Sequence, residues 1–429
     1  MSFIWWDVYN FYVENPDWNS YSGKVLSSLF YKNEAKRLTK KTSQRLYGKH
    51  IQASVSRMEK FEACPYAHFA SHGLKLKERK VFKLAAPDIG ELFHAALKMI
   101  SDELRGGQKE WKNLTRKDCQ QLSTAAVHEL APRLQNEILL SSNRHHYLTH
   151  KLQQIIERAS LVLSEHAKMS GFVPVGLELG FGPSAELPSM QFTLPNGHTM
   201  ELVGRIDRVD KAESSKGLLL RIVDYKSSDK ALNLVEVYYG LSLQILAYLD
   251  IVVTYAEQLL HDNRGALPAG VLYFHVHNPM INSTKALQPD QIEAEIFKKF
   301  KMKGLLLGDE EAVRLMDETL ESGHSQVISA GIKKTGGFYS NSSVASEEDF
   351  THLRQYVRGK FVEAGTEITN GKIDISPYKL KDKTPCAFCE YRSICQFDES
   401  MENNEYRQLS TESQSVILDK IREEAKRDE

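Results

Sequence analysis

The chain has 429 residues, too many for one ordinary domain, and 41% of them are hydrophobic, which is enough for a substantial core. No apolar run reaches the length of a membrane span. The N-terminus lacks the basic region and cleavage site of a signal peptide, so we expect a cytoplasmic protein. The formal net charge of −1 by itself argues against a nucleic-acid partner.

The charge is unevenly distributed along the chain. Residues 1–83 hold 15 Lys and Arg against 7 Asp and Glu, whereas residues 396–429 hold 5 against 10. A basic N-terminal region can bind a phosphate backbone even when the whole chain is nearly neutral. A solvated basic surface explains the charge alone equally well.

The first predicted elements are short helices. Residues 1–50 are aromatic-rich and then basic, and they show no complete element pattern, as is typical of the edge of an upstream domain. Ser56 and Glu59 form a capping box that predicts the start of a helix. Pro65 suits the first position of a second short helix, and Gly73 is expected to end it.

Helices precede strands in the rest of the chain. Asp88 opens a capping-box-like helix start, and apolar residues keep a helical period behind it. The remaining predicted elements are helices at about 116–140, 148–170 and 235–260, and strands at 173–181, 190–194, 199–210, 218–226 and 269–276. This order predicts an α/β fold, with a sheet core and a helical insertion.

Acidic residues mark the ends of two predicted strands. Alternate strand residues share a face, so Asp224 and Lys226 are expected to project to one side at the carboxyl end of their strand. Asp207 is expected to end the preceding strand. Two carboxylates and a lysine suit metal-assisted phosphodiester hydrolysis, because the carboxylates hold a hard cation and the ammonium offsets developing charge. An Asp-x-Lys pair alone is more often a solvated strand end.

Four other polar residues are candidates for the same site. His94 lies beside the apolar stripe of its predicted helix, where a structural histidine is the commoner case. Glu178 lies on a predicted strand and is equally well interpreted as a surface carboxylate. Gln244 and Tyr248 are four apart on one helix face and can hydrogen-bond a phosphate or a base, or simply belong to the core and its edge.

The five cysteines suggest a metal site rather than disulfides, because their number is odd and three of them lie within ten residues. Cys386, Cys389 and Cys395 need a fourth ligand, for which Cys64 is the obvious donor. Cys119 is expected in mid-helix, outside the site. Four thiolates suit either zinc or a [4Fe–4S] cluster, and composition does not separate them.

Together these motifs resemble the RecB-type branch of the PD-(D/E)XK nuclease superfamily. The resemblance rests on GELFH (90–94), GRIDRVD (204–210), VDYKSS (223–228) and Q-x-x-x-Y (244–248), in that order. It implies catalytic roles for Lys226, Gln244 and Tyr248 and Mg²⁺ ligation by His94, Asp207 and Asp224. The nominal Pro-Asp pair of the superfamily is absent, and the Asp of an Ile-Asp-Arg segment stands in its place.

The cysteine pattern resembles the B subunits of AddAB-type helicase–nucleases over residues from about 56 to 398. It consists of a lone cysteine in SRMEKFEACPYAHF (56–69) and C-x2-C-x5-C after the nuclease motifs. The resemblance implies a [4Fe–4S] cluster on Cys64, Cys386, Cys389 and Cys395. It also implies an AddA partner subunit and Mg²⁺-dependent exonuclease action on single strands at duplex DNA ends, during recombinational repair of double-strand breaks. No Gly-Lys pair is followed by Ser or Thr, so ATP hydrolysis is expected elsewhere.

The expected fold is therefore a RecB-type PD-(D/E)XK sheet core flanked by helices, with an iron–sulfur module joining its N- and C-terminal ends. The expected divisions are an upstream helicase-like remnant (1–55), the two parts of the iron–sulfur module (56–83 and 381–398), the nuclease domain (84–380) and an acidic helical tail (399–429). The basic residues expected to contact DNA are Arg57, Lys60, Lys75, Lys77, Arg79 and Lys80. Two alternatives are a nuclease-inactive iron–sulfur scaffold that binds DNA and a stand-alone exonuclease.

Overall fold

The computed structural model describes residues 3–28, 32–79, 81–107, 109–401 and 404–426. Its helices and helical turns are α1 (Phe3–Glu14), α2 (Pro16–Ser28), α3 (Lys40–Tyr47), α4 (Val55–Ala63), α5 (Pro65–His68), η1 (Phe69–Gly73), α6 (Ala86–Gly106), η2 (Trp111–Asn113), α7 (Arg116–Leu130), η3 (Ala131–Arg133), η4 (Ile138–Leu140), α8 (Asn143–Lys168), α9 (Leu234–Tyr238), α10 (Gln244–Thr254), α11 (Ala256–Leu260), α12 (Pro289–Lys299), α13 (Glu310–Met316), α14 (Glu347–Thr369), η5 (Pro385–Phe388), α15 (Arg392–Cys395) and α16 (Gln414–Ala425). Its strands are β1 (His50–Ala53), β2 (Val173–Phe181), β3 (Met190–Thr193), β4 (Thr199–Leu202), β5 (Gly204–Ser214), β6 (Gly217–Lys226), β7 (Ala266–His275), β8 (Lys303–Leu307), β9 (Gly323–His324), β10 (Gly331–Ile332), β11 (Val344–Ala345), β12 (Tyr378–Leu380) and β13 (Arg407–Leu409). None of the helices so described is long and apolar enough to cross a membrane.

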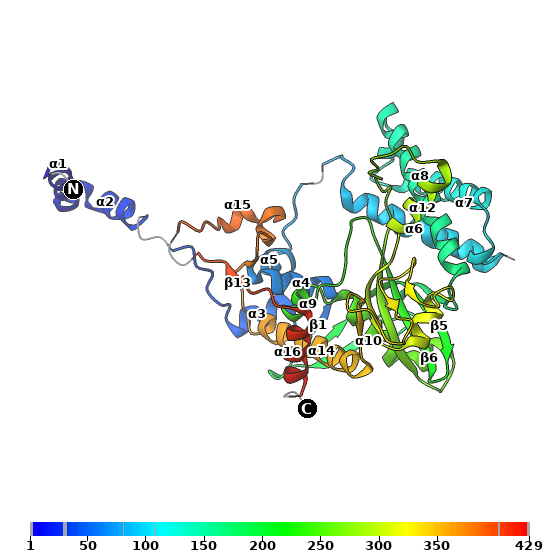
Figure 1. The fold of residues 1–429 in the computed structure, drawn as a ribbon. Coiled ribbons are helices and arrows are strands. Elements are labelled where there is room, and N and C mark those ends of the chain that lie inside the picture. The colour runs from blue at the N-terminus through cyan, green and yellow to red at the C-terminus, as the bar shows by residue number, and fades with distance from the viewer. Residues whose placement is uncertain (1–2, 29–31, 80, 108, 402–403, 427–429) are drawn as a thin grey trace.

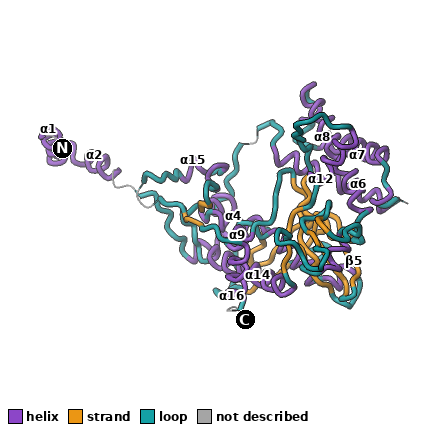
Figure 2. The backbone as a smooth tube through the Cα atoms, in the orientation of Figure 1, coloured by secondary structure: helices purple, strands orange, loops and turns teal. Residues whose placement is uncertain are grey.

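A six-stranded mixed sheet forms the centre of the fold, in the order β11-β8-β7-β6-β5-β2 (Figures 1 and 2). Strands β6 and β7 pair in parallel, whereas β5 pairs antiparallel with both β6 and β2. Nearly every residue of β6 is buried, because the strand lies inside the sheet between β5 and β7 and packs against α10. Helix α10 packs across β6 and β7, while α6, α7 and α8 pack together beside the sheet (Figure 1). The α/β prediction is confirmed.

Three predicted elements differ from the structure because of tertiary contacts. The predicted strand 199–210 is two strands: β4 joins a small sheet with β1 and β3, and β5 joins the main sheet. The predicted helix 235–260 is three helices, interrupted at Gly240, whose φ is +72°. The predicted helix 116–140 ends at Leu130, and short 3₁₀ turns follow it.

The starts of two helices also differ by a few residues. Ser54, not Ser56, caps α4, and its hydroxyl accepts a hydrogen bond from the Arg57 N–H. Asp88 lies in the first turn of α6, where its carboxylate accepts from the N–H of Ala85. Pro65 begins α5 as predicted, and the following π-helical turn ends at Gly73 as predicted.

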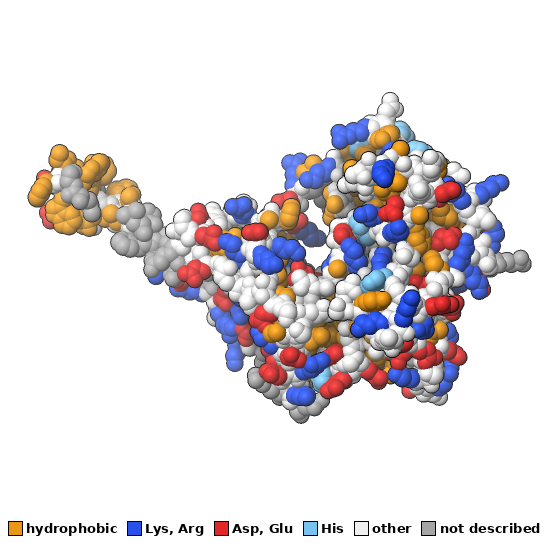
Figure 3. All heavy atoms as spheres, in the orientation of Figure 1, with side chains coloured by type: hydrophobic (Ala, Val, Ile, Leu, Met, Phe, Trp, Pro, Cys, Tyr) orange, Lys and Arg blue, Asp and Glu red, His pale blue; other side chains and the backbone are white. Residues whose placement is uncertain are grey.

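The N-terminal region contains more regular structure than its pattern predicts. Helices α1 and α2 pack on each other and project away from the rest of the molecule (Figure 1). Their surface is apolar, with Trp5 67% and Trp6 53% exposed (Figure 3). Amphipathic periodicity fails to reveal such helices because their apolar residues are not confined to one face.

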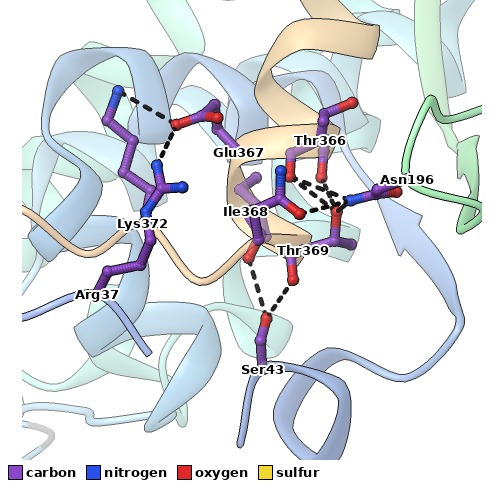
Figure 4. Close-up of polar contacts among 10 residues, drawn as sticks. Arg37, Ser43, Asn196, Thr366, Glu367, Ile368, Thr369 and Lys372 are labelled. Atoms are coloured by element: carbon purple, nitrogen blue, oxygen red, sulfur yellow. Dashed lines mark hydrogen bonds and ion pairs between the residues drawn. The ribbon is translucent and has the colours of Figure 1, made fainter. Parts of the chain in front are cut away.

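The segment around α3 is tied to the C-terminal end of α14. The Ser43 hydroxyl donates to the backbone carbonyls of Ile368 and Thr369, and Arg37 pairs with Glu367 (Figure 4). Asn196, in the turn between β3 and β4, donates to the Thr369 hydroxyl from the other side of the helix end (Figure 4). The contacts of Arg37 and Ser43 join residues more than 300 positions apart and bring the N- and C-terminal parts of the chain together beside the sheet.

Candidate active site

Strand register gathers the carboxylates of Glu178, Asp207 and Asp224 where β6 ends and β5 begins. This group, with His94 and Lys226, is called the sheet-edge site below. Arg208 on β5 is paired with Val223 on β6, so the neighbouring positions Asp207 and Asp224 lie opposite each other. On the other side of β5, Leu177 is paired with Arg208, which places Glu178 beside Asp207. Asp207 is the fourth residue of β5 and not the end of a strand as predicted. It reaches Asp224 because the antiparallel pairing puts the start of β5 beside the end of β6.

The backbone at Glu178 is unusual. Its φ is +49°, a left-handed conformation that residues other than glycine seldom adopt and that is common at functional sites. The neighbouring Arg205 guanidinium lies 3.6 Å from the Glu178 carboxylate. The Glu178 side chain is mostly buried, and its carboxylate lies 3.8 Å from His94 Nδ1, so the structure brings this candidate to the other site residues and not to the open surface.

His94 approaches the carboxylates from α6. Its Nδ1 atom lies 3.2 Å from Asp207 Oδ1 and 3.8 Å from Glu178 Oε1, and the three ligand atoms all lie within 4.8 Å of one another. Burial would lower the pKa of His94, but hydrogen bonds and Coulomb attraction from Asp207 and Glu178 raise it to about 10. A proton on His94 therefore balances the two carboxylates. A divalent cation, which takes oxygen and imidazole ligands, could take over that role.

Asp224 and Lys226 lie at the carboxyl end of β6 and point to the same side, as predicted. The Lys226 ammonium is 2.6 Å from the Asp224 carboxylate, which is only 2% exposed. Burial and the nearby Asp207 raise the pKa of Asp224 to about 6, while Lys226 opposes that shift. The buried Asp224 carboxylate thus has Lys226 as a cationic partner and lies close to Asp207, although it does not belong to the group formed by His94, Glu178 and Asp207.

Gln244 and Tyr248 lie on the first turns of α10, which crosses the sheet behind the carboxylates. The Gln244 amide donates to the Tyr248 hydroxyl at 2.9 Å, as expected for side chains four residues apart on one helix face. Burial raises the pKa of Tyr248, and Asp207 and Asp224 add to that effect, so the phenol stays neutral within electrostatic reach of both carboxylates.

Two charged residues near this site, Lys230 and Glu59, are not among the site candidates that the sequence indicates. The positive charge of Lys230 lowers the pKa of Asp224 and so acts against the effect of burial. The Lys230 ammonium lies 5.2 Å from the ring centroid of Tyr273. Its position four residues after Lys226 is the only hint in the sequence. Glu59 contacts the start of α10 from a distant helix, and no local pattern predicts a contact across 184 positions.

Four cysteines line a second site, a cavity of about 410 Å³ between α4, the segment around residue 375 and the η5–α15 region. Its thiols are those of Cys64, Cys386, Cys389 and Cys395. Burial raises the pKa of the Cys64 thiol to about 11 and also raises the pKa values of Cys386 and Cys395. Cys119 is fully buried in α7 and does not line this cavity.

The basic residues expected to contact DNA differ in their surroundings. Arg57 is turned inward, where its guanidinium donates to His68 and to the backbone of Gln52. Lys60 is exposed on α4, and three further basic side chains are exposed in the segment that follows η1, namely Lys75, Lys77 and Arg79. Lys80 lies outside the described residues. Figure 3 shows Lys and Arg side chains around a hollow between the part of the molecule with α15 and the part with α6.

Comparisons with known proteins point to one superfamily. Residues 52–396 match the PD-(D/E)XK nuclease superfamily, and residues 1–28 match the fifth domain of ATP-dependent helicase/deoxyribonuclease AddB. The chain is 63% identical over 428 residues to the B subunit of the ATP-dependent helicase/deoxyribonuclease of Bacillus licheniformis, and 60% identical over 425 residues to that of Bacillus subtilis. These alignments cover 100% and 99% of this chain, but only 36% of each relative.

Proposed function

The chain belongs to the PD-(D/E)XK nuclease superfamily, and from this premise we propose that its sheet-edge site hydrolyses DNA phosphodiester bonds with Mg²⁺. The observation that carries the proposal is the convergence of His94, Glu178 and Asp207 within 4.8 Å, next to the Asp224–Lys226 pair. The relatives' names include deoxyribonuclease, which agrees with this chemistry.

The residues have separate roles in the proposed reaction. His94, Asp207 and Asp224 would hold the Mg²⁺ ion, as the resemblance implies, and Glu178, whose carboxylate converges with His94 and Asp207, would be a further ligand. When bound, Mg²⁺ supplies a Lewis acid for the phosphate and favours hydroxide formation. Lys226 offsets the charge that develops on the phosphate oxygens.

Gln244 and Tyr248 would orient the DNA strand. Their amide and phenol can hydrogen-bond phosphate oxygens or base edges. Both therefore position the substrate rather than transfer protons.

We further propose that Cys64, Cys386, Cys389 and Cys395 hold a [4Fe–4S] cluster. The four cysteines line one cavity of about 410 Å³, and four thiolates are the usual ligand set of such a cluster. The similarity of the cysteine pattern to that of AddAB-type B subunits favours the cluster over zinc.

The chain spans 36% of the length of its relatives, so its wider role is also a proposal. We place it in a cytoplasmic helicase–nuclease complex, with an AddA partner subunit, that processes single strands at duplex DNA ends by exonuclease action for recombinational repair. Residues 1–55 would pack on an upstream helicase-like domain, which agrees with the apolar surface of α1 and α2. Residues 56–83 and 381–398 would form the cluster module, residues 84–380 the nuclease domain and residues 399–429 a tail.

One experiment tests the central proposal. Purified, iron-containing protein is incubated with single-stranded DNA, with Mg²⁺ or with a chelator. Cleavage that requires Mg²⁺ and is absent from an Asp207→Asn variant is the expected result. An intact, metal-binding protein that leaves DNA uncut would support the alternative, a nuclease-inactive scaffold.

A further inference from the structure

Helix α10 begins without a cap from its own segment. The first N–H groups of a helix have no partners within it, and Leu243, at the N-cap, offers no side-chain acceptor. Glu59 of α4 fills this role from elsewhere in the chain. Its Oε1 atom accepts from the N–H of Leu243 at 2.7 Å and from that of Gln244 at 2.9 Å. A carboxylate at this end also interacts favourably with the helix dipole.

A second contact holds α4 against the same turn. Gly240 has a φ of +72°, and a Cβ atom there would lie 2.6 Å from Cγ of Glu62. Glu59 and Glu62 are three residues apart and share one face of α4. The turn before α10 is therefore packed closely on α4 by van der Waals contact as well as by hydrogen bonds.

The residue capped by Glu59 belongs to the candidate active site. Gln244 donates its amide to Tyr248, and both side chains depend on where α10 begins. Burial raises the pKa of Glu59, while hydrogen bonds from Leu243 and Gln244 and the charges of Lys230 and Lys226 oppose this shift. Glu59 thus lies within electrostatic reach of the lysine at the end of β6.

The other end of α4 belongs to the cysteine site. The helix is followed directly by Cys64, and Glu59 itself lines the cavity between the four thiols. A short, nine-residue helix therefore connects the cysteine cavity to the start of the helix that carries Gln244. Because Glu59 of α4 accepts hydrogen bonds directly from the first N–H groups of α10, a shift of α4 is transmitted to α10.

We propose that Glu59 is a positioning residue, which fixes the start of α10 on α4 and so holds Gln244 and Tyr248 in register with the metal ligands. This inference rests on the proposed nuclease function. It adds that the active-site geometry depends on how α4 is seated by the cysteine module. A glutamine in place of Glu59 would keep an acceptor for both N–H groups, whereas an alanine would leave them without one.

The test compares variants of one helix in the full chain. Glu59→Ala should lower kcat for single-stranded DNA about tenfold, with iron content and the Kd for DNA unchanged, because the two N–H groups lose a charged acceptor. Glu59→Gln should restore most of the activity, and Glu59→Asp, shorter by one methylene, should lie between them. Glu62→Gln is the matched control, because it removes the charge, keeps the Cγ atom that lies against Gly240 and leaves a side chain that no hydrogen bond joins to α10 within the described residues; it should cleave at the wild-type rate.

A double variant shows whether Glu59 acts through Gln244. If it does, Glu59→Ala combined with Gln244→Ala should cleave no more slowly than Gln244→Ala alone. Hydrogen exchange in the peptide covering 241–248 should accelerate in Glu59→Ala but not in Glu59→Gln. Wild-type kcat in folded Glu59→Ala, or fully additive losses in the double variant, would overturn this inference alone. A wild-type chain that binds Mg²⁺ but cuts no DNA would overturn the proposed function and this inference together.

Discussion

The sheet-edge site and the cysteine cavity reach their arrangement by different means. At the sheet edge, hydrogen-bonded strand pairing sets the positions, and opposite charges already contact each other, with Lys226 2.6 Å from Asp224 and His94 3.2 Å from Asp207. In the cavity, thiols from the two ends of the domain surround a space of about 410 Å³, and burial raises the pKa of Cys64 to about 11. The first site is organised by ion pairs between its own side chains, whereas in the second the proposed cluster would join the two ends of the domain.

The largest expected effect is on DNA cleavage at the sheet-edge site, with DNA binding preserved. Asp224→Ala should reduce DNA cleavage by about a thousandfold or more, because the site loses a metal ligand. DNA binding should stay nearly intact, since the change also removes negative charge near the phosphate. Cleavage assays and DNA-binding titrations on the same preparation check this. An Asp224→Ala protein that cuts at the wild-type rate would remove this carboxylate from the mechanism.

The corresponding change in the cysteine cavity should act mainly on stability. Cys64 and Cys386 are 322 positions apart, and releasing a cross-link around so long a loop costs on the order of 4–5 kcal/mol in the free energy of unfolding. Cys64→Ala should therefore lose iron absorbance, lower Tm and weaken binding to DNA ends together.

Cys119→Ala is the matched control for the cavity. It should retain its iron and its DNA binding, and lose only about 1 kcal/mol, because Cys119 is fully buried and its loss leaves a small void. A brown Cys64→Ala protein of normal Tm would show that the fourth ligand lies elsewhere.

Lys226→Ala refines the comparison within the sheet-edge site. The lysine acts on charge that develops during the reaction, so kcat should fall by about a hundredfold. Magnesium binding, measured by calorimetry, should be retained, because the ligands His94, Asp207 and Asp224 remain. Loss of metal binding as complete as in Asp224→Ala would contradict the separate role assigned to Lys226.

The smallest expected effect is on the free energy of unfolding in acid, and it arises from a buried histidine in the part of the chain that matches the nuclease superfamily. His166 of α8 is buried against Phe274 and Phe297, and burial, with Arg221 and Arg208 nearby, lowers its pKa to about 3. As the pH falls, His166 is protonated in the unfolded chain before it is protonated in the folded chain. The free energy of unfolding therefore has its full value above about pH 6.5 and decreases as the pH falls towards about 3. Between about pH 7 and about pH 5 this loss amounts to about 2 kcal/mol.

A substitution at His166 measures that loss directly. His166→Phe should remove most of it, as followed by urea unfolding at the two pH values. His146→Gln, at an exposed position of the same helix, should leave the pH dependence unchanged. An equal pH dependence in His166→Phe and in the wild type would assign the acid sensitivity to other groups.

Local sequence determined the features that depend on neighbouring residues. The alternation in β6 places Asp224 and Lys226 on one side of its carboxyl end, and the four-residue spacing places Gln244 and Tyr248 on one helix face. Proline chemistry likewise determined where α5 begins. These predictions succeeded because strand and helix periods are fixed by backbone geometry alone.

Only the tertiary structure decided which distant residues meet. Strand register brought Glu178 and Asp207 together, and long-range packing split the helix predicted at 235–260 at Gly240, which lies against Glu62. The cap that Glu59 provides to α10 crosses 184 positions. Such contacts follow from burial and hydrogen bonding over the whole chain, where local preferences of a fraction of a kcal/mol per residue are overridden by the packing of entire elements.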